Sequence, residues 1–65
     1  MLSTTDKYGT LIQFSLKNIK AIFYYDSEIH IEYFGEAESI EICFENKKLC
    51  VEFSETLMES CNERD

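Results

Sequence analysis

The stretch that decides the fold runs from Glu28 to Glu45 and reads EIHIEYFGEAESIEICFE. On both sides of the turn signal GEAE, isoleucines alternate with polar residues, which is the two-residue period of a β-strand with one buried face. We therefore predict strands over residues 28–34 and 39–45, joined through residues 35–38. Joining them across this turn pairs Ile31 with Ile42 and gathers the isoleucines on one face.

The same register gives the other face an acidic character. The predicted cross-strand pairs on it are Glu32 with Glu41, Glu28 with Glu45, and His30 with Cys43. Directly opposed like charges destabilise a sheet by about 0.2–1 kcal/mol per pair. Either a cationic partner relieves this repulsion, or the glutamates form an ordinary solvated strand face.

Two more strands are expected upstream. Residues 10–16 alternate apolar and polar side chains, and residues 20–25 are dense in β-favouring types. Asp26 and Ser27 fit a two-residue hairpin turn, which pairs Ile22 with Ile31 in phase with the first hairpin. The four strands form an antiparallel β-meander.

The period changes after Asn46. Cys50, Phe53, Leu57 and Cys61 recur at helical spacing, so we predict a helix over residues 47–62, capped by Asn46. The fold class is α+β, with this C-terminal helix packed on one sheet face and the other face open. The predicted core comprises Ile12, Phe14, Leu16, Ile22, Tyr24, Ile29, Ile31, Tyr33, Ile40, Ile42, Phe44, Leu49, Cys50, Phe53 and Leu57.

Length and composition limit the class of protein. A chain of 65 residues, 45% hydrophobic, is expected to be a single small domain over 1–65, with 1–8 and 62–65 as loose ends. Three cysteines and no secretory signal favour a cytoplasmic location. We expect no membrane span and no cofactor, since neither a long apolar run nor a glycine-rich phosphate loop occurs.

Charge indicates the kind of partner. Thirteen acidic residues against six basic ones give a net charge of -7, which disfavours direct contact with nucleic acid and favours a basic protein surface. We predict two contact regions. The open sheet face comprises Phe23, Tyr25, Glu28, His30, Glu32, Phe34, Glu41, Cys43 and Glu45, and a helix ridge comprises Glu52, Glu55 and Glu59.

Neither catalysis nor metal binding is expected on this face. Glu28, His30 and Glu32 form a row along one strand, with about 7 Å between neighbours, and do not converge as metal ligands would. Cys43 opposite His30 resembles a nucleophile and base, but the surrounding carboxylates would raise the pKa of its thiol. A metal or enzymatic site around His30 is therefore the weakest alternative.

The main prediction is a non-enzymatic protein-interaction module, an inhibitor or an adaptor, that docks carboxylates and aromatic rings onto a basic site. By analogy with small acidic proteins of phages and mobile elements, that site could be one that normally binds nucleic acid. The alternative is a self-assembling structural or ligand-sequestering module, in which open sheet faces or edges pair between subunits to form a homo-oligomer.

Overall fold

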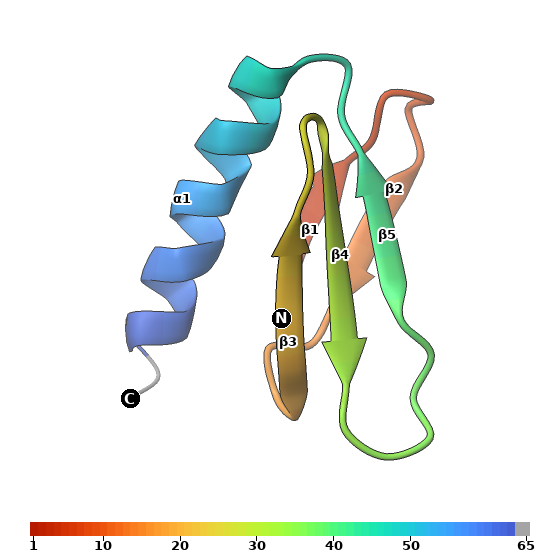
Figure 1. The fold of residues 1–65 in the computed structure, drawn as a ribbon, viewed down its shortest axis with the longest axis vertical. Coiled ribbons are helices and arrows are strands. Elements are labelled where there is room, and N and C mark those ends of the chain that lie inside the picture. The colour runs from red at the N-terminus through yellow and green to blue at the C-terminus, as the bar shows by residue number, and fades with distance from the viewer. Residues whose placement is uncertain (64–65) are drawn as a thin grey trace.

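The fold was analysed in a computed structural model that describes residues 1–63 (Figure 1). The elements, in chain order, are β1 (Leu2–Thr5), β2 (Leu11–Phe14), β3 (Ile19–Tyr24), β4 (Glu28–Tyr33), β5 (Ile40–Cys43) and α1 (Lys47–Glu63). They form two antiparallel sheets, a hairpin of β1 and β2 and a three-stranded sheet in the order β3-β4-β5. The α+β class is confirmed, whereas the single four-stranded meander is not.

The N-terminal hairpin explains this difference. The first residues were expected to be loose, but Leu2–Thr5 pairs with Leu11–Phe14, so β2 has β1 as its partner and not β3. The Asp6 carboxylate closes the connecting turn by accepting hydrogen bonds at 2.9 Å from the backbone N–H groups of Tyr8 and Thr10. Gly9 completes the turn with a φ of +82°.

The β3–β4 register agrees with the prediction. Ile22 lies opposite Ile31 and Tyr24 opposite Ile29, across the turn at Asp26 and Ser27. A bulge after Ile19 ends the regular pairing.

The β4–β5 register differs by two residues from the prediction. Ile31 pairs with Ile40 and not with Ile42, and His30 pairs with Glu41. The predicted oppositions of Glu32 with Glu41, Glu28 with Glu45, and His30 with Cys43 are therefore wrong. A slip of two residues keeps every side chain on its predicted face, because strand side chains alternate with a period of two.

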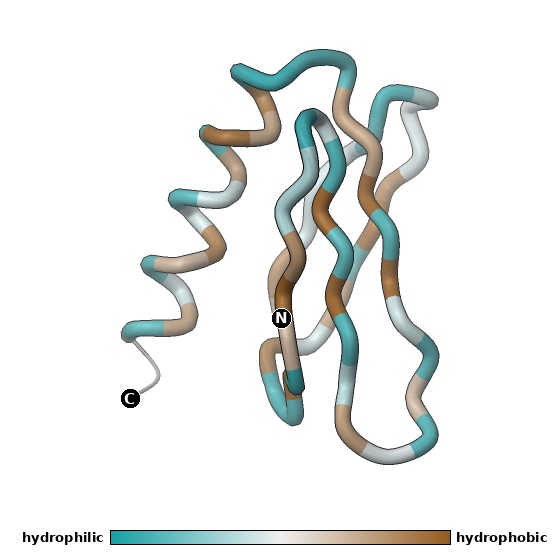
Figure 2. Tube along the Cα trace, in the orientation of Figure 1, coloured by the Kyte–Doolittle hydropathy of each residue, from teal (hydrophilic) through white to brown (hydrophobic). Residues whose placement is uncertain are grey.

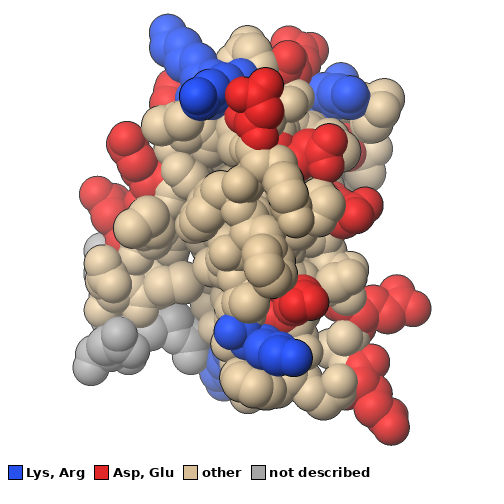
Figure 3. All heavy atoms as spheres, in the orientation of Figure 1, with Lys and Arg blue, Asp and Glu red and all other residues tan. Residues whose placement is uncertain are grey.

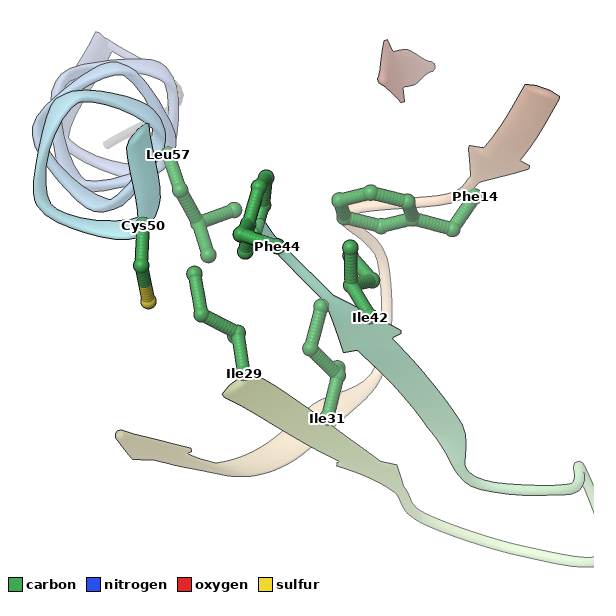
Figure 4. Packing of buried hydrophobic residues seen from close by; sticks show 7 residues of the cluster. All are labelled: Phe14, Ile29, Ile31, Ile42, Phe44, Cys50 and Leu57. Atoms are coloured by element: carbon green, nitrogen blue, oxygen red, sulfur yellow. The ribbon is translucent and has the colours of Figure 1, made fainter. Parts of the chain in front are cut away.

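The inner face of the three-stranded sheet carries the core. Ile29, Ile31 and Ile42 are fully buried there, and apolar and polar residues alternate along β4 and β5 (Figure 2). In Figure 4, Leu57 and Cys50 point from α1 toward the sheet, and Phe14 points in from the β1–β2 hairpin. The core is thus covered by the helix and the hairpin together.

The predicted core is largely confirmed. The buried cluster is Phe14, Ile29, Ile31, Ile42, Phe44, Cys50 and Leu57, and the residues packed against it are Leu2, Ile12, Leu16, Ile19, Ile22, Tyr33, Ile40, Phe53 and Cys61. Tyr24 and Leu49 were placed in the core but are exposed. Tyr24 lies at the end of β3 and lines a groove that opens to solvent, and Leu49 lies in the first turn of α1 and is not among the residues packed on the core.

The helix begins where predicted. The Asn46 side-chain oxygen accepts a hydrogen bond from the Leu49 N–H at 3.0 Å, which is the geometry of an N-cap. The helix ends at Glu63, one residue beyond the predicted end at Asn62. Residues 62 and 63, also assigned to a loose end, are therefore helical, and residues 64–65 of that predicted end lie outside the described residues. Over the described chain, no helix is long and apolar enough to cross a membrane.

Candidate functional site

The outer face of the three-stranded sheet, on the side away from α1 and the hairpin, is the candidate site. Register places Phe23, His30 and Glu41 in one row across β3, β4 and β5. In the same way, Glu28 lies opposite Cys43 at one end of the strands. Side chains alternate between the two faces along each strand. Because the isoleucines occupy the inner face, these polar and aromatic side chains point outward.

His30 lies at the centre of this face. Its Nε2 is 2.9 Å from Glu28 Oε1 on the same strand, and its Nδ1 is 3.6 Å from Glu41 Oε1 on β5. The Tyr25 ring packs against the imidazole at a centroid distance of 4.7 Å, tilted by 57°. The half-buried imidazole therefore lies between carboxylates from two strands and packs against an aromatic ring.

The two ring nitrogens of His30 make different contacts. In the neutral ring one nitrogen donates, and the 2.9 Å contact fits donation from Nε2 to Glu28. The 3.6 Å separation from Glu41 is longer than a hydrogen bond and becomes an attractive ion pair only when the ring is protonated. The cluster thus places two carboxylates on either side of one imidazole ring.

Two aromatic rings give the face its apolar part. Phe23 is 43% exposed and Tyr25 is 55% exposed, although each belongs to or borders a paired strand. Figure 3 looks onto this sheet and shows an area without charged side chains near its centre, with acidic groups around it and basic groups toward the two ends. Clustered exposed rings of this kind mark contact surfaces more often than solvated ones.

The other predicted face residues lie around this cluster. Glu32, opposite Ala21, and Cys43 are half-buried on the same face, and Glu45 is exposed just after β5. Phe34 is exposed after the end of β4, where it lines a separate groove. The structure thus brings together Phe23, Tyr25, Glu28, His30 and Glu41, which we call the outer-face cluster.

That separate groove was not predicted from the sequence. It has a volume of about 500 Å³ and lies between the β2–β3 and β4–β5 connections, with Phe14, Tyr33 and Phe34 among its walls. The Tyr33 hydroxyl donates a 2.7 Å hydrogen bond to the Ser15 carbonyl oxygen and so ties the two sheets together beside it. Burial raises the pKa of this hydroxyl above its ordinary value of 10.0. No sequence signal locates the groove, because it depends on how two loops approach each other.

The predicted helix ridge is exposed. Glu52, Glu55 and Glu59 all lie on the solvent side of α1, while the side chain of Glu63 lies outside the described part. Across residues 1–62, the close contacts between a carboxylate and a basic side chain all involve His30, and none joins a lysine to a carboxylate. The carboxylates of the helix ridge are therefore available to an external cation.

The described residues bear on two kinds of chemistry, metal ligation and thiol reactivity. Among them, no three histidine, cysteine, aspartate or glutamate side chains are grouped so that they could hold a metal ion. Burial, together with the charge of Asp26, raises the pKa of the Cys50 thiol, which disfavours the reactive thiolate. Comparisons with protein-family models, curated proteins and solved structures find no match.

Proposed function

We propose that this chain is a non-enzymatic protein-interaction module whose outer-face cluster docks onto a basic site of a partner protein. The single observation that carries the proposal is the uncovered sheet face on which Phe23 and Tyr25 stand beside the carboxylates of Glu28 and Glu41. In this arrangement the rings contribute most of the affinity, and the carboxylates guide the approach and set the orientation.

The charge balance supports a cationic partner. The chain carries a net charge of -7, and none of its described lysines pairs with a carboxylate. Such a surface repels other acidic proteins and nucleic acid and attracts lysine and arginine side chains. A partner that itself binds nucleic acid offers a basic site of this kind, and occupying that site would make the module an inhibitor.

The test compares two double variants with the same loss of charge. Glu28→Gln with Glu41→Gln changes the outer-face cluster, whereas Glu52→Gln with Glu59→Gln changes only the helix ridge. Each protein is immobilised, exposed to a lysate of its source cell and eluted with salt. We expect one or more polypeptides to be retained by the wild type and the helix variant and lost from the face variant.

Folding must be verified by circular dichroism before the lysate is applied. Equal retention by the face variant and the wild type would refute the outer-face cluster as the docking site. If the folded wild type retains no polypeptide, the docking proposal itself fails.

A further inference from the structure

The outer edge of β3 presents backbone groups that no strand within residues 1–63 uses. β3 is at the end of the sheet order. The Tyr25 N–H donates to the Glu28 carbonyl at 2.9 Å, so Tyr25 and Phe23 direct their backbone groups toward β4. The residues that alternate with them, Ile22 and Tyr24, therefore direct their N–H and C=O groups away from β4 at the open edge.

The opposite edge of the sheet is partly covered. On β5 the Cys43 carbonyl accepts a 2.8 Å hydrogen bond from the Lys7 N–H, so the β1–β2 turn lies against that edge. Among the described hydrogen bonds outside the strands, none engages the backbone of Ile22 or Tyr24. The two edges are therefore unequal, and β3 is the one open to pairing.

A groove accompanies the open edge. It has a volume of about 380 Å³ and lies between the end of β3 and α1, with Tyr24 and Asp26 on one side and Cys50 and Val51 on the other. Tyr24 is 47% exposed and Val51 is 43% exposed, so apolar surface lies next to the free backbone groups. Met58, also exposed, lies two helical turns beyond Val51 and extends this apolar stripe along α1.

We infer that the β3 edge is a strand-addition site for an extended segment of a partner protein in which apolar and cationic residues alternate. Ile22 and Tyr24 supply the backbone ladder, as in known modes of strand addition to a sheet edge. Apolar side chains of the added strand enter the groove beside Val51. The alternate side chains emerge on the outer face beside the rings of Phe23 and Tyr25, where cations interact favourably with aromatic faces.

The partner's positive charge follows from the net charge of -7 and rests on the proposed function. The strand-addition mode itself rests on the edge and the groove.

The probe is a synthetic octapeptide of alternating lysine and valine, compared with a block peptide of the same composition. Binding is followed by heteronuclear NMR and by amide hydrogen exchange on the full chain.

We expect the alternating peptide to bind at least tenfold more tightly than the block peptide and to slow hydrogen exchange at the Ile22 and Tyr24 amides by at least tenfold. Two further peptides carry N-methyl groups on either the valines or the lysines. Only one of these should lose binding, since alternate N–H groups of a strand face opposite edges. Loss of binding by the peptide with methylated valines indicates that the added strand runs antiparallel to β3. Loss of binding by the peptide with methylated lysines indicates that it runs parallel.

A matched pair of variants tests the groove. Val51→Asn should weaken binding of the alternating peptide about threefold to tenfold, whereas Leu49→Asn, at a position of similar exposure (42%) that does not line the groove, should not. Equal binding of the alternating and block peptides, with shifts confined to the outer face, would overturn strand addition and leave the proposed function standing.

Other outcomes are equally decisive. Absence of binding by any peptide would contradict both the strand-addition site and a cationic partner. Equal tolerance of both methylated peptides would exclude a backbone ladder. Protection of the Ile22 and Tyr24 amides that rises with protein concentration in the absence of peptide would identify a second copy as the occupant and overturn the assignment to a partner.

Discussion

Replacing Leu57 by alanine tests whether α1 covers the inner sheet face as described. The Leu57 side chain is fully buried and points from α1 toward Ile29 and Phe44 (Figure 4). Leucine-to-alanine changes at such sites cost about 2–5 kcal/mol through lost burial and the cavity left behind. A chain of this length has a total stability of only about 3–10 kcal/mol, so the variant loses a large share of it.

Met58→Ala is the matched control, because Met58 adjoins Leu57 in the chain yet is 55% exposed. Its effect should stay within about 0.5 kcal/mol. Urea denaturation followed by circular dichroism measures both. At 4–8 °C per kcal/mol, a loss of about 3 kcal/mol lowers the melting temperature by about 12–24 °C. A cost below about 1 kcal/mol for Leu57→Ala, or equal costs for the two variants, would mean that the helix packs through another side.

Three further predictions concern the helix cap, one turn and the tyrosines. Asn46→Ala should lower the free energy of unfolding by about 1 kcal/mol and Asn46→Asp should not, since only alanine lacks the acceptor for the Leu49 N–H; equal losses in urea denaturation would argue against the cap. Gly35→Ala should cost about 1 kcal/mol through backbone strain alone, because the φ of Gly35 is +83° and nothing lies within 4 Å of the added Cβ; an unchanged denaturation midpoint would contradict this. Burial raises the pKa of the Tyr24 and Tyr33 hydroxyls above 10.0, so the folded state holds these protons more tightly than the unfolded chain and stability should fall as the pH rises above about 10. Tyr24→Phe and Tyr33→Phe should each flatten that fall in denaturation curves at alkaline pH, and a slope like that of the wild type would refute the assignment.

The faces of the central strands could be predicted from the sequence, but their register could not. The alternation of apolar and polar residues along β4 and β5 indicates which side chains share a face. Ile29, Ile31 and Ile42 are buried together, as expected. A two-residue slip leaves that alternation unchanged, so the pattern carries no information about it. The register is set instead by the connection after β4, which spans residues 34–39 and is longer than the four-residue turn expected.

The N-terminal hairpin was missed for a different reason. Leu2–Thr5 is short and mostly polar, and it becomes a strand only because β2 pairs with it. The Asp6 and Gly9 turn is a signal that could have been recognised, since these residue types favour turns. The connection between β2 and β3 passes through Asn18, whose φ is +64°. Asparagine is enriched in this conformation, but the residue type alone does not predict that β3 leaves the sheet of β2.

The residues of the candidate site were predicted from the sequence, but the contacts between them were not. Phe23, Tyr25, Glu28, His30 and Glu41 were all assigned to the open face, which needs only the parity of each strand. The contacts of His30 with Glu41 and Tyr25 depend on register and on ring packing. The expected repulsion between opposed glutamates is consequently replaced by an imidazole between two carboxylates.

The central claim, that the outer-face cluster is assembled around His30, is tested most directly by one cross-strand NMR distance. His30 and Glu41 are a non-hydrogen-bonded antiparallel pair, in which the Cα atoms lie only about 4.5 Å apart. We predict a strong nuclear Overhauser effect between the Hα atoms of His30 and Glu41. A strong effect between Glu32 and Glu41, or between His30 and Cys43, in its place would contradict the account.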